Sequence, residues 1–191
     1  MASTLSPKVK ELIAKARIVR FDGWQAQFAE DAIARLQSAD EQRIYLDDAA
    51  LETMPGATIA RYFRDRANTI VDTARAQVLT QFPGITEPGG GLYPAIRAEA
   101  CWRDFWHFLR CVTYGIAAQR IDYTSDPGLA YMEQLYRELQ VPLDAMVYGV
   151  RSLKTASKQQ LDRLEVTFDD GQIDPYFDRL IQALDQFEPV V

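Results

Sequence analysis

The stretch 97–115, RAEACWRDFWHFLRCVTYG, decides both the fold and the chemistry that this chain suggests. At 100° per residue, six of its side chains fall on one helical stripe. These are Arg97, Cys101, Asp104, Phe108, Cys111 and Gly115. Core-facing helices normally present leucine, isoleucine, valine and alanine, whereas this stripe mixes a cation, two thiols, a carboxylate and an aromatic ring. The pattern predicts a helix whose stripe is not an ordinary core face.

The same residues also allow a purely structural interpretation. A buried cysteine usually behaves as a small hydrophobic residue, and Arg97 and Asp104 can form a surface ion pair without any function. Aromatic residues such as Trp102 and Phe105 more often belong to a core than to a ligand site. Periodicity alone therefore supports a helical domain with a polar, thiol-bearing stripe.

Helix signals dominate the rest of the chain. The pairs Ser6-Pro7, Asp126-Pro127 and Asp174-Pro175 each place a capping oxygen before a proline in the first helical turn. Apolar spacing predicts helices from residue 7, over 24–36, in part of 40–52, and over 59–78, 94–119, 126–139, 142–155, 157–169 and 175–187. Two breaks are clear, namely Met54-Pro55-Gly56 and the run FPGITEPGGG at 82–91.

No strand-like alternation, repeat or linker interrupts this series. A length of 191 residues suits one domain, so we predict a single all-α domain over 1–191. The formal net charge of −6 argues against a nucleic-acid partner, which would require a basic face. No apolar stretch approaches the roughly 20 residues that cross a bilayer, and the N-terminus has no signal-peptide plan. We therefore expect a cytoplasmic protein that does not insert into membranes.

The cysteines and the histidine exclude the usual structural sites. Cys101 and Cys111 lie ten residues apart on one predicted helix, about 15 Å along its axis, which is too far for an internal disulfide. With His107 they offer three ligands at most, and a structural zinc site needs about four. No nucleophile–base pair or phosphate loop is recognisable, so we predict that the chain is not an enzyme.

The run from Pro88 to Ala118 resembles the chromophore-bearing region of the phycobiliproteins, the phycocyanin and allophycocyanin subunits. The family pattern is Pro-Gly-Gly, two residues, tyrosine, then Cys-x-Arg-Asp, an aliphatic–arginine pair and Thr-Tyr. Its counterparts here are Pro88-Gly89-Gly90, Tyr93, Cys101-Trp102-Arg103-Asp104, Leu109-Arg110 and Thr113-Tyr114. The stretches 66–79, 131–154 and 176–178 also resemble the family. The resemblance implies a globin-like fold with a bilin-pocket core over 57–191 and an extended, divergent N-terminal helical segment over 1–56.

The resemblance also implies a cofactor, a linear tetrapyrrole similar to phycocyanobilin. Cys101 stands where the family forms a thioether to the bilin, and Asp104 where a carboxylate accepts hydrogen bonds from pyrrole N–H groups. Such charge-assisted bonds are roughly twice as strong as neutral ones. The implied binding residues are Cys101, Arg103, Asp104, Arg97, Tyr93, Tyr114 and Trp102.

These residues have different implied roles. Arg103 and Arg97 match positions that pair with propionates, for which the planar guanidinium fork is suited. Tyr93 and Tyr114 match aromatic positions near the pocket. Trp102 replaces a smaller residue and either stacks on the bilin or fills its space. Arg110 matches an arginine at the subunit interface, outside the pocket.

Three functions fit this sequence. The first is a light-harvesting subunit that dimerises with itself or another phycobiliprotein-like subunit, receives its bilin from a lyase, and works in the phycobilisome on the thylakoid surface. The second is a bilin-binding relative outside the antenna that carries, buffers or senses bilin in pigment synthesis or turnover. The third is a chromophore-free interaction protein. A haem-binding globin fits less well, because the only histidine, His107, lies off the stripe.

Overall fold

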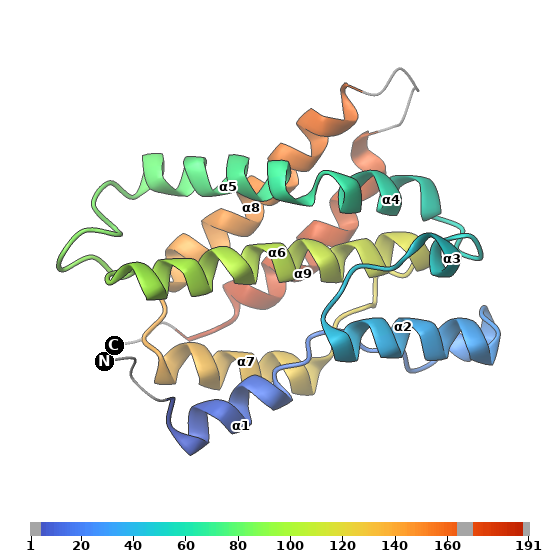
Figure 1. Cartoon of the computed structure of the whole chain (residues 1–191), viewed down its shortest axis with the longest axis horizontal. Helices are drawn as coiled ribbons and strands as arrows, with labels where there is room; N and C mark the ends of the chain where they lie inside the picture. Colours follow the sequence, from blue (N-terminus) through green and yellow to red (C-terminus); the bar gives the residue numbers. More distant parts are fainter. Residues whose placement is uncertain (1–4, 164–169, 189–191) are drawn as a thin grey trace.

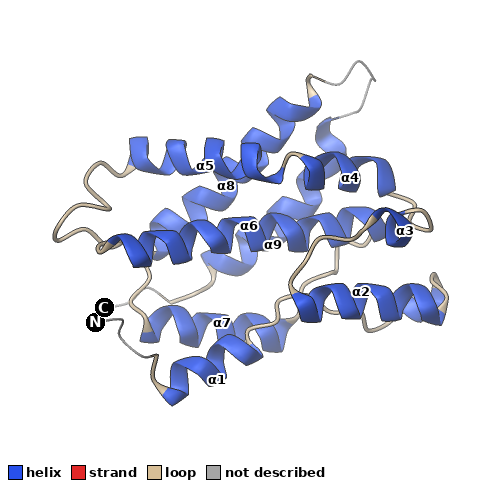
Figure 2. Cartoon of the chain, viewed as in Figure 1, coloured by secondary structure: helices blue, strands red, loops and turns tan. Residues whose placement is uncertain are grey.

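A computed structural model describes residues 5–163 and 170–188, which form helices joined by turns and loops, with no strand among them (Figure 2). The α-helices are α1 (Pro7–Lys15), α2 (Glu30–Gln42), α3 (Asp48–Leu51), α4 (Ala57–Asp65), α5 (Ala67–Gln81), α6 (Ala95–Ala118), α7 (Asp126–Glu138), α8 (Leu143–Leu161) and α9 (Asp174–Asp185). Two 3₁₀ turns, Trp24–Ala26 and Asp170–Ile173, complete the described elements. The predicted all-α class is confirmed.

Helix α6 runs through the middle of the molecule. In Figure 1, α5 lies along one side of it, α7 and α1 lie on the other side, and α8 and α9 pass behind it. Its core side chains, among them Phe105, Leu109 and Val112, are fully buried. The helix ends at Gln119, whose left-handed backbone (φ 51°) lets its N–H bond the carbonyls of the last turn. The predicted helix over 94–119 is thus present almost to the residue.

The predicted helix over 59–78 is wrong as a single element, because the chain bends at Arg66 (φ −115°, ψ 12°) and divides it into α4 and α5. Helix α4 packs on α6, whereas α5 packs chiefly on α8. The guanidinium of Arg66 lies 3.8 Å from the ring centre of Tyr62. The bend has a tertiary cause, since the two halves pack against different partners and no proline or glycine marks the site.

Other expected boundaries also moved. Residues 142–155 and the start of 157–169 form one continuous helix, α8, because the small buried residues Ala156 and Ser157 pack without interrupting it. Residues 164–169 lie outside the described part. The expected helix over 24–36 begins instead as a 3₁₀ turn and continues as α2 from Glu30.

Only one of the three proline-associated caps forms as predicted. Ser6 accepts a hydrogen bond from the Val9 N–H at 3.2 Å. Helix α7 is capped by Ser125 rather than Asp126, since Ser125 has the extended backbone that a capping residue needs. Asp174 follows a 3₁₀ turn directly and caps nothing; it forms ion pairs with Lys154 and Lys158.

The N-terminal segment is fastened to the start of α7 by its backbone. The Arg20 N–H bonds the Tyr123 carbonyl at 2.9 Å, and the Ser125 N–H bonds the Ile18 carbonyl at 2.8 Å. Gly128, in the first turn of α7, touches the same segment so closely that a Cβ atom would lie 1.7 Å from the Arg17 carbonyl oxygen. Glycine is therefore required by close backbone approach. Within residues 5–163 and 170–188, no helix is both long and apolar enough to cross a membrane.

We predict that Gly128→Ala lowers the free energy of unfolding by about 1–3 kcal/mol, because the added methyl must push two backbones apart. Urea unfolding followed by circular dichroism measures this change. Gln134→Ala, at an exposed position of the same helix, is the matched control and should change stability by less than about 0.5 kcal/mol. Equal urea midpoints for the two variants would contradict the close approach of Gly128 to the Arg17 backbone.

Candidate functional site

Cys101 lies in the N-terminal half of α6 and is 5% exposed. Burial and, to a smaller extent, the nearby Asp104 carboxylate raise the pKa of its thiol to about 12, although Arg97 and Arg103 act in the opposite direction. The thiolate is the nucleophilic form of cysteine. At neutral pH this buried thiol is therefore protonated and a poor nucleophile.

Asp104 follows three residues later, so its side chain neighbours that of Cys101 on the helix surface. Its Oδ2 accepts a hydrogen bond of 3.1 Å from the hydroxyl of Tyr136 on α7. Burial raises the pKa of this carboxyl to about 6, and the hydroxyl of Tyr136 and the charges of Arg103 and Arg43 act in the opposite direction. The carboxylate is therefore mostly ionised at pH 7, although burial makes its charged form less favourable than it would be in water.

Arg97 precedes Cys101 by one turn and binds backbone carbonyls. Its guanidinium donates to the carbonyl of Leu139 at 2.8 Å and to that of Gln140 at 2.9 Å. It also reaches the carbonyl of Gly91 at 3.2–3.3 Å. Arg103 differs, because its side chain is exposed and forms no hydrogen bond or ion pair with the described residues. The two arginines are thus not equivalent: Arg97 is engaged and Arg103 is available.

These contacts join α7 to α6 on both sides of Cys101. The close backbone neighbour of α7 is α1 rather than α6, so long side chains bridge the two helices. Arg97 holds the residues just after α7 on one side of Cys101, and Asp104 holds Tyr136 on the other. We call residues 136–140 the α7 clasp. The clasp therefore contacts α6 one turn before and one turn after the buried Cys101.

Three of the predicted site residues do not share this arrangement. Trp102 points about 160° away from Asp104 around the helix. Its ring centre lies 5.6 Å from that of Phe105, and the guanidinium of Arg75 in α5 lies over its ring. Tyr114 lies thirteen residues beyond Cys101, about 20 Å along the axis. Tyr93, which is 48% exposed, lies in the loop before α6. The structure therefore brings together Cys101, Asp104 and Arg97, with Arg103 at the edge.

Tyr114 instead belongs to a buried polar network that the sequence reasoning missed. Arg110, expected at a subunit interface, is 4% exposed and pairs with Asp40 of α2 at 2.9 Å. Arg17 binds the other oxygen of Asp40 at 2.7 Å. Tyr114 accepts a hydrogen bond from Arg110 and donates one to the Ile44 carbonyl. One carboxylate therefore pins two parts of the N-terminal segment to α6.

A signal for this network does exist in the sequence. Asp40 follows Ile33 by seven residues and Leu36 by four, so it lies on the apolar face of α2. A carboxylate on such a face requires a buried partner.

We predict that Asp40→Asn costs about 3–5 kcal/mol of unfolding free energy, since it leaves the Arg110 guanidinium buried without its counter-charge. Chemical denaturation of the purified variant measures the loss. Arg17→Ala is the comparison: the side chain of Arg17 is 32% exposed, and its removal leaves the inner pair intact, so the loss should be about 1 kcal/mol. Equal losses of unfolding free energy in the two variants would show that the buried Arg110–Asp40 pair contributes no more than the Arg17–Asp40 pair.

A second prediction concerns Asp104 and pH. Its folded pKa of about 6 lies above its usual value near 3.8, so the fold favours the protonated form. This contribution is complete below pH 4 and is lost as pH rises through 6, a change on the order of 3 kcal/mol. Asp104→Asn should therefore be more stable than the wild type at pH 7.5, and the advantage should vanish near pH 4. Urea unfolding between pH 4 and 8 tests this, and parallel curves for both proteins would refute it.

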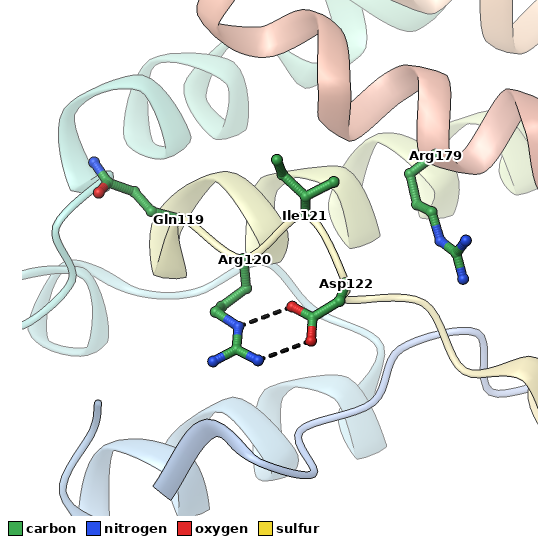
Figure 3. A pocket seen from close by; sticks show the side chains of 5 residues that line it. All are labelled: Gln119, Arg120, Ile121, Asp122 and Arg179. Atoms are coloured by element: carbon green, nitrogen blue, oxygen red, sulfur yellow. Dashed lines mark hydrogen bonds and ion pairs between the residues drawn. The ribbon is translucent and has the colours of Figure 1, made fainter. Parts of the chain in front are cut away.

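A separate hollow of about 430 Å³ lies at the other end of α6 (Figure 3). It is lined by Gln119, Arg120, Ile121, Asp122 and Arg179. Arg120 faces Asp122 and forms two hydrogen bonds of 2.8 Å with it, and Arg179 donates to the Thr124 hydroxyl at 2.7 Å. Since both cations have partners, the hollow is a poor anion site, and about 27 Å of helix separates Gln119 from Cys101.

Comparison with known proteins gives relatives for most of this chain. The model of the family described as "Phycobilisome protein" matches residues 34–184. Allophycocyanin subunit alpha-B of Nostoc sp. is 33% identical over 158 residues, which cover 82% of this chain and 93% of the relative. Allophycocyanin alpha-B chain of Synechococcus sp. is 34% identical over 127 residues, covering 66% and 76%.

A solved structure is similar as well. It is that of a far-red fluorescent biliprotein derived from a far-red induced allophycocyanin F subunit of Chroococcidiopsis thermalis. The two chains align with a TM-score of 0.64 and 25% identity, over 69% of this chain and 96% of that one.

Proposed function

The chain belongs to the phycobilisome protein family, and on that premise we propose that it is a bilin-binding phycobiliprotein that serves light harvesting. Its relatives are allophycocyanin subunits, and a protein of similar fold is a fluorescent biliprotein. The observation that carries the proposal is the grouping, toward one end of α6, of Cys101, Asp104 and Arg103, whose guanidinium pairs with no described residue.

The chemistry of this group fits a linear tetrapyrrole. A bilin has a carbon that a thiol can attack, pyrrole N–H groups that need acceptors, and propionates that need cations. When bound, it supplies the conjugated system that absorbs visible light. Cys101 provides the thiol and Asp104 an acceptor oxygen. Arg103 provides a guanidinium that no described residue engages.

The remaining predicted residues take supporting roles in this proposal. Arg97 is already bonded to three backbone carbonyls, so we assign it to holding the α7 clasp instead of a propionate. Trp102 and Tyr114 support α6 from its other faces. Tyr93 is exposed in the loop before α6, and we assign it no direct contact with the pigment.

Attachment requires the closed site to open. The Cys101 thiol, with its pKa near 12, yields little thiolate at neutral pH. Moving the α7 clasp away would hydrate the thiol and lower its pKa toward the ordinary value. We propose that a bilin lyase promotes this opening, and that the pigment is similar to phycocyanobilin. We further propose assembly with another phycobiliprotein subunit, in a phycobilisome at the thylakoid surface.

We predict that Cys101→Ala abolishes covalent attachment while leaving the fold intact. The test is co-expression with bilin-producing enzymes and candidate lyases, followed by a denaturing gel read by zinc-enhanced fluorescence. The wild type should give a fluorescent band and Cys101→Ala none. Cys111→Ala is the matched control, because Cys111 is equally buried on the same helix, and its band should persist. A band retained in Cys101→Ala would overturn the assignment.

The burial of Cys101 favours a second candidate, a bilin handler outside the antenna. A protonated, enclosed thiol suits non-covalent binding as well as lyase-dependent attachment. Such a protein would shift the absorption of bilin in its native state but show no band on the denaturing gel. Its mass in size-exclusion chromatography would also lack the heteromer that an antenna subunit forms.

A further inference from the structure

Tyr136 was not among the residues that the sequence singled out, yet its hydroxyl makes the one hydrogen bond that the Asp104 carboxyl forms with the described residues. We propose that Tyr136 is a positioning residue of the bilin site, whose hydroxyl holds one oxygen of Asp104 and leaves the other for pyrrole N–H groups. This inference rests on the proposed function for its ligand, but the contact it concerns lies between two residues of the protein itself.

Tyr136 is itself held firmly enough to position another group. It is 4% exposed, and its ring meets that of Phe187 edge to face, with centres 6.3 Å apart. Its helix is anchored just beyond it, where Arg97 binds the carbonyls of Leu139 and Gln140. A buried phenol hydroxyl needs a partner, and Asp104 is the partner within the described chain. The contact is thus fixed from both sides.

Holding one oxygen changes what the other can do. A carboxylate with two unbound oxygens turns about its terminal torsion, which is broad and poorly fixed. Once Tyr136 holds Oδ2 at 3.1 Å, Oδ1 has a defined direction. No described residue donates a hydrogen bond to Oδ1. A pigment would therefore meet one oriented acceptor rather than a rotating one.

The same contact influences the charge of Asp104. Donation from the Tyr136 hydroxyl stabilises the ionised carboxylate and lowers its pKa. The other groups that face Asp104 are Arg103 and Cys101 on α6 and Arg43 at the end of α2. Both arginines also favour the ionised form, and the thiol is neutral. Loss of the phenol hydroxyl therefore leaves two favourable charges in place and raises the pKa.

The test is Tyr136→Phe, which keeps the ring against Phe187 and removes only the hydroxyl. In the pigment-free protein, carbon-13 NMR follows the Asp104 carboxyl through a pH titration. Its pKa should rise from about 6 by about one pH unit, the worth of one hydrogen bond. In the pigment-loaded protein, we expect an ionised Asp104 that accepts from pyrrole N–H groups to sustain the long-wavelength band, so the pH at which acid bleaches the band should also rise.

Tyr123→Phe is the matched control, since Tyr123 is also fully buried and donates its hydroxyl to a backbone carbonyl, that of Tyr176, at 3.0 Å. It should leave both midpoints unchanged. If Tyr136→Phe does not fold, 3-fluorotyrosine at position 136 serves instead, because this stronger donor should lower the carboxyl pKa.

Two results would overturn the inference: an unchanged Asp104 pKa in the Tyr136 variant, or an equal shift in the Tyr123 control. Failure of the wild type to take up any bilin would instead defeat the proposed function. The titration of the pigment-free protein would still decide the role of Tyr136.

Discussion

Helix α6 is largely buried although it carries charged side chains, and the surrounding structure must supply partners for those charges. Most of its 24 residues are buried, and a polar group taken from water without a partner costs several kcal/mol. Arg110, which is buried, and Asp104, whose pKa burial raises, are two ionisable groups of α6 that bear this cost. Each obtains its partner from a distant part of the chain, Asp40 in α2 and Tyr136 in α7. Satisfying α6 therefore also fixes where the N-terminal segment and α7 lie.

The two polar contacts differ in how completely they are satisfied. Asp40 receives two arginines on its two oxygens, so nothing remains for a ligand to bind. Among the described residues, only the Tyr136 hydroxyl bonds the Asp104 carboxyl, on one oxygen, and burial raises the pKa of that carboxyl. A saturated network specifies structure, whereas an unsaturated one keeps capacity for another donor. This difference, more than burial or charge alone, separates the structural half of α6 from its candidate site.

The sequence was sufficient for what depends on local pattern. The helical class, the break at Met54-Pro55-Gly56, the loop over 82–91 and the helix that carries both cysteines all follow from periodicity and turn residues. The division at Arg66 could not be predicted, because α4 and α5 separate to reach different partners. The continuity of α8 through Ala156 could not be predicted either, because small residues are compatible with both a helix and a break.

The candidate site shows the same limit. Spacing alone placed Cys101 and Asp104 side by side, since residues three apart on a helix are neighbours. Helix phase also indicates that Trp102 points elsewhere, which the family pattern did not convey. The partners on other helices depend on how the chain folds back. Tyr136 carried one hint, a phenol at core spacing after Leu129 and Met132 on α7, which implies a buried acceptor without identifying it.

Burial of Cys101 protects its thiol from unwanted reactions, but it also hinders attachment of a pigment. The α7 clasp brings the Tyr136 hydroxyl to Asp104, beside the buried Cys101, and burial keeps the thiol protonated. A buried neutral thiol resists oxidation and chance reactions, because the thiolate is the reactive form. The same burial obstructs a pigment, whose attachment needs both space and thiolate. In the function proposed for this site, movement of α7 away from α6 would remove both obstacles together, without any change within α6.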